Sequence, residues 1–496
     1  MTENLRKAIR FLRRGEVISL EAFSPRRTVL DWLREDMRLT GTKEGCAEGD
    51  CGACTAVIGR LKGGRLVYEP VNTCILLLGQ LDGAELITVD DLAADGVLHP
   101  VQAAMVAHHG SQCGFCTPGI VMSLFALYHE GARPVTREAI CDALAGNLCR
   151  CTGYRPIIDA AMDVCAGEAA DRFTAARARS EAALAAMATA EDVQVGDDTS
   201  FFAIPRSVEA LAALYLAHPD ATLLAGGTDV GLWLTKGLMD ISKFIWLGRI
   251  VGFDNISKTA DGIRIGAGAS HSDAYCHLAR IDPDLGEVMR RFGSTQVRAS
   301  GTVGGNIANG SPIGDLAPCL IALGSEVELR RGDLTRALPL EDFFLAYRQQ
   351  DRQASEFVSA LTVPEPVAGQ HFRAFKVSKR FDEDISAVMG AVRLTLDGAT
   401  ITGARIAFGG MAGTPKRAAA TEAALIGASI GHVASWSAAL SAMATDFQPM
   451  TDQRATASYR STVARNLLAK ALIEIAGLSS GETRLIIRRD ALEAAE

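Results

Sequence analysis

Residues Gly45–Cys54 read GCAEGDCGAC and set the architecture of the first part of this 496-residue chain. They place Cys46, Cys51 and Cys54 in a C-x4-C-x2-C pattern, and Cys74 follows after nineteen residues. This is the spacing of plant-type [2Fe–2S] loops, in which four thiolates hold the cluster. The interspersed glycines allow positive φ and a close approach of backbone N–H groups to the sulfur atoms. The pattern predicts an iron–sulfur loop, with a structural zinc site as the alternative.

A second group of cysteines follows. Cys113 and Cys116 form C-x2-C, and after thirty-two residues Cys149 and Cys151 form C-x-C. Four thiolates suit either an iron–sulfur cluster or tetrahedral zinc, and the spacing alone leaves both open. The remaining cysteines have no paired partner nearby in sequence and are expected to be small buried hydrophobic residues: Cys141, Cys165, Cys276 and Cys319.

The overall charge restricts the class of protein. Lys and Arg number 50 against 58 Asp and Glu, which gives a net charge of −8 and argues against a nucleic-acid partner. No apolar run approaches the roughly 18 residues of a membrane span. The first seventeen residues are interrupted by charges throughout and do not resemble a signal peptide. We therefore expect a cytoplasmic protein without membrane contact, in which cysteines are ligands rather than disulfide partners.

The periodicity divides the chain into parts. Residues 1–90 show short strands around one helix that Thr28 caps, which predicts a small α+β unit. Residues 98–166 show four helices, three of which start at a proline (Pro100, Pro118, Pro156) and one at Thr136, and the first three of which end at a glycine, with the second cysteine group in the two breaks. An alanine-rich linker follows, then a mixed α/β part. The last part has strands near 389–396 and 402–408 and helices near 416–426 and 455–476.

Glycine-rich stretches mark the α/β part. Leu223–Asp229 is a short strand running into Gly-Gly-Thr-Asp, and Ser300–Gly310 reads SGTVGGNIANG. Such stretches offer successive N–H groups to a phosphate chain, and beside iron–sulfur clusters they favour FAD, which couples one-electron to two-electron chemistry. Ile265–Ala269 resembles the start of G-x-G-x-x-G, but His271 breaks that fingerprint. The sequence has no P-loop pattern.

Several motifs resemble the xanthine oxidase family of molybdenum hydroxylases, and the similarity covers essentially the whole chain. They are Lys43–Cys54, Gln112–Gly119 (QCGFCTPG), Gly146–Tyr154 (GNLCRCTGY), Thr302–Asn306 with Ser311–Asp315, and Phe408–Arg417. Iron–sulfur and flavin parts in one chain without a large molybdenum domain resemble the small subunit of the family's bacterial enzymes.

The resemblance implies an α+β multidomain fold. It comprises a β-grasp ferredoxin-like [2Fe–2S] domain over residues 1–90 and a four-helix [2Fe–2S] domain over 91–167. A linker over 168–197 leads to an α/β FAD-binding domain of the vanillyl-alcohol-oxidase/PCMH type over 198–366. A C-terminal flavoprotein α+β domain over 371–490 completes the chain. The second cluster is then also [2Fe–2S].

The resemblance also assigns site residues. All eight cysteines of the two groups would bind clusters, the helical one nearer the molybdenum cofactor and the ferredoxin-like one nearer the flavin. Gln112 matches a position that approaches molybdopterin, and Ser378–Ile385 matches a charged loop that governs NAD access. Gly227 departs from the eukaryotic pattern and can make no side-chain contact. The FAD contacts would be Ala225, Gly226, Gly227, Thr228, Asp229, Val230, Phe292, Thr302, Val303, Gly304, Gly305, Asn306, Asp315, Val358 and Lys376.

The implied function is electron transfer. Electrons from hypoxanthine or xanthine hydroxylation at a partner molybdenum–molybdopterin subunit would pass through two [2Fe–2S] clusters to FAD and then to NAD+, within an α2β2 heterotetramer. No purine-chemistry residue is expected in this chain. The alternatives are the same role in an aldehyde or N-heterocycle hydroxylase such as a nicotinate enzyme, or a non-catalytic iron–sulfur carrier or zinc-stabilised scaffold.

Overall fold

The computed structural model describes residues 5–132 and 134–479. Its contacts divide the chain into two compact units. The first contains Met1–Val251 and Gly293–Gly301, and the second contains Gly252–Phe292 and Thr302–Glu496. Residues 1–4 of the predicted first domain and 480–490 of the predicted last domain lie outside the described residues. Within those described ranges, no helix is long and apolar enough to cross a membrane.

The first unit contains a mixed five-stranded sheet in the order β3-β2-β6-β4-β5. β2 (Ile9–Arg13) and β3 (Glu16–Leu20) pair antiparallel, and β2 pairs parallel with β6. The Thr28 side chain accepts a hydrogen bond from Asp31 N and starts the short helix α1 (Val29–Asp31), as predicted. The other strands are β4 (Thr55–Lys62), β5 (Arg65–Asn72) and β6 (Glu85–Ile87). The small α+β prediction is confirmed.

Four helices follow, as the proline and glycine punctuation predicts. They are α2 (Pro100–Ala107), α3 (Thr117–Glu130), α4 (Arg137–Leu144) and α5 (Arg155–Val164). Proline stands in the first turn of three of them, where its missing N–H costs no helical bond. α3 packs against β4 and β5, and one hydrophobic core joins Tyr68 of the sheet to Phe125 of α3.

The segment predicted as a linker is mostly regular structure. It contains α6 (Arg172–Met187), which packs on β2, β4 and β5, and β7 (Asp192–Gly196). β7 belongs to a second five-stranded sheet, in the order β1-β7-β8-β10-β9. The other elements of this part are β1 (Leu5–Arg6), β8 (Phe201–Ile204), α7 (Val208–Ala217), β9 (Thr222–Leu224), α8 (Val230–Thr235) and β10 (Lys243–Trp246).

The two sheets of the first unit share a core. Phe11 and Trp32 of the first sheet's region cluster with Phe202 and Phe244 of the second. The parallel pairing of β1 with β7 also ties the start of the chain to the second sheet. Because cores and strands are shared, these parts form one compact unit and not a string of separate bodies. The short helix α11 (Thr295–Ser300) belongs to the same unit.

The second unit begins with an antiparallel sheet in the order β11-β12-β17-β13-β14. Its strands are β11 (Ile256–Thr259), β12 (Gly262–Gly266), β13 (Glu326–Arg331), β14 (Leu334–Pro339) and β17 (Phe357–Val363). The helices here are α9 (His271–Ile281), α10 (Pro283–Arg290), α12 (Val303–Asn309), α13 (Leu316–Leu323) and α14 (Leu340–Phe343). A small hairpin joins β15 (Phe344–Ala346) to β16 (Gln349–Gln350).

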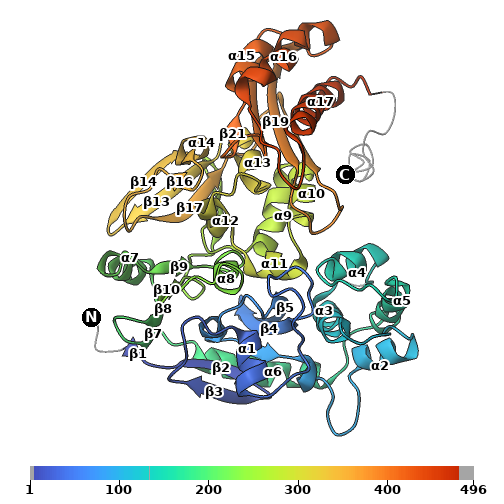
Figure 1. Cartoon of the computed structure of the whole chain (residues 1–496), viewed down its shortest axis with the longest axis vertical. Helices are drawn as coiled ribbons and strands as arrows, with labels where there is room; N and C mark the ends of the chain where they lie inside the picture. The colour runs from blue at the N-terminus through green and yellow to red at the C-terminus, as the bar shows by residue number, and fades with distance from the viewer. Residues whose placement is uncertain (1–4, 133, 480–496) are drawn as a thin grey trace. The chain divides into compact units, whose positions relative to one another are not determined.

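The C-terminal part is built on the sheet β18-β19-β20-β21. The strands are β18 (Gln370–Val377), β19 (Val388–Asp397), β20 (Thr400–Gly409) and β21 (Lys416–Arg417). The helices are α15 (Ala419–Leu425), α16 (Ser437–Asp446) and α17 (Ala457–Ile475). α17 packs on β18 and β19, and α15 packs on β20 (Figure 1). The two strands and the last helix are confirmed, whereas α16 was not predicted.

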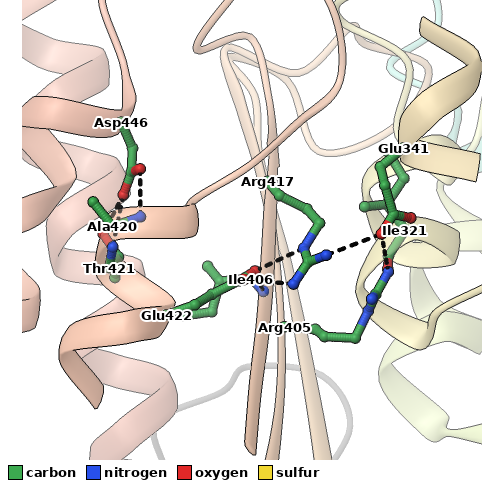
Figure 2. A network of polar contacts seen from close by, with 9 residues as sticks. All are labelled: Ile321, Glu341, Arg405, Ile406, Arg417, Ala420, Thr421, Glu422 and Asp446. Atoms are coloured by element: carbon green, nitrogen blue, oxygen red, sulfur yellow. Dashed lines mark hydrogen bonds and ion pairs between the residues drawn. The ribbon is translucent and has the colours of Figure 1, made fainter. Parts of the chain in front are cut away.

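Charged residues hold the end of α13 to this sheet (Figure 2). Arg405 Nε and Nη2 donate to the carbonyl oxygen of Ile321 at 3.1 and 2.9 Å. Glu341 accepts from Arg405 at 2.6 Å and from Arg417 at 3.0 Å. Because α13 follows directly after Asp315, the network fixes the position of a predicted FAD contact.

Candidate iron–sulfur and flavin sites

The first cysteine group lies together in one loop region. Cys54 Sγ and Cys74 Sγ are 3.3 Å apart, and the N–H of Cys51 donates to Cys46 Sγ at 3.3 Å. Hydrogen bonding with Cys51 and Cys74 lowers the pKa of the Cys46 thiol, and the hydrogen bond to Cys46 raises the pKa of Cys74. The Sγ separation exceeds the roughly 2.05 Å of a disulfide. Four converging thiols in a glycine-rich loop fit a [2Fe–2S] group.

The second group lies where α2 leads to α3 and α4 leads to α5. Cys113 and Cys151 are exposed, whereas Cys116 and Cys149 are half-buried. Hydrogen bonds from the Phe115 backbone and from Cys151 lower the pKa of Cys113, and the bond to Cys113 raises the pKa of Cys151. The structure thus brings these four thiols together at the surface, and they too fit a four-thiolate group.

The two cysteine loops touch directly. The N–H of Leu148 donates to the carbonyl oxygen of Cys51 at 3.0 Å, and Asn147 Nδ2 donates to that of Gly52 at 3.1 Å. Gly52 has a φ of +68°, and an added Cβ there would lie 2.0 Å from the carbonyl oxygen of Gly146. Only glycine therefore allows this approach.

The first predicted FAD segment offers open backbone donors. Among the residues that the structure describes, the N–H groups of Gly226, Gly227 and Thr228 donate no hydrogen bond. Gly227 has a φ of +81°, and a Cβ on Gly226 would lie 1.9 Å from the carbonyl oxygen of Ser300. Successive unbonded N–H groups in a glycine turn fit a phosphate chain.

The carbonyl group at the start of that segment is fixed from two sides. Gln80 Nε2 and Trp246 Nε1 both donate to Ala225 O at 3.1 Å. The remaining predicted contacts of the segment continue into α8, with Asp229 exposed and Val230 half-buried. The first unit therefore holds the turn rigidly while its amides stay open.

The second predicted FAD segment differs from the expectation. Gly305 N donates to Thr302 Oγ1 at 3.0 Å, Val303 N donates to Ala269 O at 2.9 Å, and Gly304 N also donates to a carbonyl oxygen. The expectation of free N–H groups at these positions is wrong, because the helix cap and the neighbouring turn use them. The contact of Thr302–Asn306 with FAD stays a prediction.

The other predicted FAD contacts of the second unit are packed among polar and aromatic groups. Asp315 accepts from Lys376 Nζ at 2.5 Å and from Ser386 Oγ at 2.5 Å, and both members of the ion pair are buried. The Phe292 ring stacks on His271 with centroids 4.3 Å apart. Lys376 is thus a buried ion-pair partner. Val358 is buried in β17.

The charged loop and Gln112 are exposed. Arg291 stacks over Phe381 of the loop at 4.2 Å and donates to its carbonyl oxygen at 3.0 Å. The N–H of Arg380 donates to Asp384 Oδ2 at 2.9 Å. Gln112 stands beside Cys113 with an exposed side chain.

The unassigned cysteines separate into two classes. Cys165 and Cys319 are buried as expected, but Cys141 and Cys276 are exposed. The expectation is wrong for these two because they lie on solvent-facing sides of the amphipathic helices α4 and α9.

Sequence reasoning missed two buried clusters. His99 and His129 both reach Asp171 Oδ2 through Nε2, at 2.5 and 3.0 Å. Gln296 joins the two cysteine loops. A lone His, Asp or Gln carries no spacing signal, so the pattern of residues could not reveal these clusters.

Sequence profiles cover most of the chain. Residues 88–162 match a [2Fe-2S] binding domain, residues 194–366 match the FAD binding domain in molybdopterin dehydrogenase, and residues 373–475 match the CO dehydrogenase flavoprotein C-terminal domain. The chain belongs to the molybdenum hydroxylase family. It carries the iron–sulfur and flavin parts of that family, in the order that the two thiol groups and the glycine turns indicate.

Curated relatives in the molybdenum hydroxylase family include xanthine dehydrogenases. The one from Emericella nidulans is 31% identical, over 90% of this chain and 37% of that protein. Xanthine dehydrogenase/oxidase from Mus musculus is also 31% identical, over 83% of this chain and 35% of that protein. The chain thus spans about a third of the length of these relatives.

Two solved structures share the fold of somewhat more than half of this chain. A carbon monoxide dehydrogenase chain from Hydrogenophaga pseudoflava has a TM-score of 0.52 and 28% identity, over 55% of this chain and 95% of that chain. Quinoline 2-oxidoreductase from Pseudomonas putida 86 has a TM-score of 0.51 over 57% of this chain and 98% of that chain, and at 22% identity it shows the fold alone.

Proposed function

We propose that the chain is the electron-transfer and NAD-reducing subunit of a xanthine dehydrogenase. The observation that carries this proposal is the direct contact of two four-thiol groups in one compact unit, in a chain with flavin-binding profiles and xanthine dehydrogenase relatives. The [2Fe–2S] clusters would move electrons singly, and FAD would collect two of them for NAD+.

The proposed overall reaction balances. A C–H bond of hypoxanthine or xanthine becomes C–OH with oxygen from water, and NAD+ takes up the two released electrons as NADH while one proton is released. The hydroxylation belongs to a partner subunit with a molybdenum–molybdopterin centre. The chain's own residues would hold the electron carriers: the eight cysteines for the clusters, and the open amides of Gly226–Thr228 for the phosphate chain of FAD.

Exposure supports the proposed order of electron carriers. Cys113 and Cys151 are exposed, whereas Cys54 and Cys74 are buried. A donor outside the chain would therefore reach the second group first, and the first group would receive the electron through the contact of Leu148 with Cys51. FAD would follow, and the exposed Ser378–Ile385 loop would control the approach of NAD+.

An apolar groove beside Cys113 supports docking of the molybdenum subunit. The groove has a volume of about 480 Å³ and is lined by Leu98, Met105, Val106, Val121 and neighbouring residues. Val106 is 65% exposed, which is costly without a covering partner. We propose that the molybdenum subunit covers this surface in a cytoplasmic α2β2 heterotetramer, with Gln112 approaching the molybdopterin.

A second candidate function keeps the same role but changes the substrate of the partner. The likeness to the carbon monoxide dehydrogenase chain and to the CO dehydrogenase flavoprotein C-terminal profile supports a hydroxylase that acts on something other than a purine. An aldehyde or an N-heterocycle such as nicotinate would suit this candidate.

Co-expression with a candidate molybdenum–molybdopterin subunit tests the proposal. The purified complex should form NADH from NAD+ when hypoxanthine or xanthine is added. NADH formation with an aldehyde or nicotinate, but not with purines, would support the second candidate. A complex that oxidises purines without reducing NAD+ would contradict the proposed acceptor.

A further inference from the structure

Gln296 closes a buried polar network between the two cysteine loops. Its side chain is 1% exposed, and its Nε2 lies 3.1 Å from Thr55 Oγ1, 3.2 Å from Ser123 Oγ and 3.1 Å from Asn147 Oδ1. Thr55 follows the first cysteine loop directly, and Asn147 belongs to the second. A single amide group therefore contacts both loops.

The hydrogens of the network fix the direction of the Gln296 amide. Thr55 Oγ1 donates to Gly52 O at 2.7 Å, and Ser123 Oγ donates to Asn147 Oδ1 at 2.6 Å. Because each hydroxyl hydrogen is already used in one of these bonds, both oxygen atoms can only accept a hydrogen bond from Gln296. All three neighbours are acceptors, so only the amide nitrogen can face them.

The same network supports the contact between the loops. Asn147 accepts from Gln296 and donates its own Nδ2 to Gly52 O at 3.1 Å. The next residue, Leu148, makes the 3.0 Å backbone bond to Cys51 O and precedes Cys149. Gln296 also fills the space over Gly146, where an added Cβ would lie 2.2 Å from Gln296 Oε1.

Gln296 comes from a distant part of the chain. Its helix α11 lies within Gly293–Gly301, which belongs to the first unit although the residues before and after it belong to the second. Thr295 anchors the helix by donating to Asp142 O at 3.0 Å, away from both cysteine loops. This segment thus belongs to the first unit, where Gln296 contacts both cysteine loops.

We propose that Gln296 is a positioning residue for electron transfer between the two clusters. It holds Asn147 and thereby the backbone hydrogen bond from the N–H of Leu148 to Cys51 O, which connects the two cysteine loops. One electron leaves the second cluster and enters the first, and no bond forms or breaks. This inference rests on the proposed function.

Pulse radiolysis of the purified full chain with freeze-quench EPR tests the proposal. The pulse reduces the exposed cluster, and the EPR signals follow the passage of the electron to the buried one. In Gln296→Met, which keeps the volume but removes the donor, transfer should be about tenfold slower with unchanged iron content, as for other outer-shell changes. Thr295→Val, which removes a hydrogen bond of the same helix outside the network, should transfer at the wild-type rate.

The other outcomes also decide the proposal. A Gln296→Met rate within about twofold of wild type, or an equal slowing in Thr295→Val, would overturn it. If Gln296→Met loses iron, Ser123→Ala decides, because it removes a hydroxyl of the same network that accepts from Gln296, donates to Asn147 and lies outside both loops: slowed transfer supports the proposal and a wild-type rate overturns it. A wild-type chain without iron–sulfur signals would instead overturn the proposed function itself.

Discussion

The N–H of Leu148 lies 3.0 Å from the carbonyl oxygen of Cys51, so one hydrogen bond joins two groups of four cysteines. The contact exists because Gly52, where an added Cβ would lie 2.0 Å from Gly146 O, lets the two backbones meet. It places the buried thiols of one loop next to the surface thiols of the other. The chain is thereby suited to carry electrons from its surface to its interior.

Cys113→Ser should interrupt the path at its surface end. Loss of one thiolate should lower the rate of electron transfer from purine to NAD+ in the complex to less than about a hundredth of the wild-type rate. The NADH-to-dye activity should remain. The matched control is Cys141→Ser, which removes an exposed cysteine outside both groups. If NADH-to-dye activity also disappeared while flavin was retained, the proposed order of carriers would be wrong.

Gly226→Ala should weaken FAD binding. The added Cβ would lie 1.9 Å from Ser300 O, and relieving such a clash costs about 1–3 kcal/mol, which corresponds to roughly tenfold or more in affinity. Flavin content after gel filtration measures the effect. Gly167→Ala, where an added Cβ has no neighbour within 4 Å, should retain wild-type flavin. Full flavin retention in Gly226→Ala would remove this turn from the proposed site.

Asp171→Asn should destabilise the first unit strongly. Burial alone would raise the pKa of Asp171, but hydrogen bonds from His129 and His99 hold it well below its ordinary value. Val101 N donates to His99 Nδ1, which leaves the hydrogen of that ring on Nε2, facing Asp171. Loss of the carboxylate should cost about 3–5 kcal/mol in unfolding free energy.

A nearby exposed pair provides the control for that variant. His108 and Asp163 are 33% and 67% exposed, so Asp163→Asn should cost less than about 1 kcal/mol. Thermal unfolding of the two variants gives the comparison. Equal losses of stability would show that the buried cluster contributes no more than a surface pair.

Glu85→Gln should change the pH dependence of stability. Burial raises the pKa of Glu85 to about 7 in the folded chain, from 4.5 for the free group. The folded state binds this proton more tightly than the unfolded state. The free energy of unfolding therefore falls as the pH rises from 4.5 to about 7 and is constant above that. At pH 8 the variant should be more stable by about 1–3 kcal/mol, and below pH 4.5 the difference should vanish. A melting temperature that differs equally at both pH values would contradict the assigned pKa.

The sequence predicts those features that depend on local pattern. The spacing of Cys46, Cys51 and Cys54 predicts a cluster loop, and the positions of Pro100 and Thr136 locate the starts of two helices. These signals are readable because thiolate geometry, proline and helix caps each act over a few residues. The α+β organisation follows from the same local rules.

Features that depend on distant packing could not be predicted. Gln296 contacts residues more than 140 positions away, and no local pattern marks such a residue. The amides of Val303 and Gly304 are occupied because a turn from β12 reaches them, which the glycine count cannot show. The linker also joins a sheet, because β7 finds partners in β1 and β8.

Cofactor analysis of the purified full chain decides whether it holds the proposed electron carriers. Two [2Fe–2S] clusters and one flavin predict about four iron atoms per chain, one FAD, and visible absorption that NADH bleaches under anaerobic conditions. A colourless chain that contains zinc and no flavin would contradict the account.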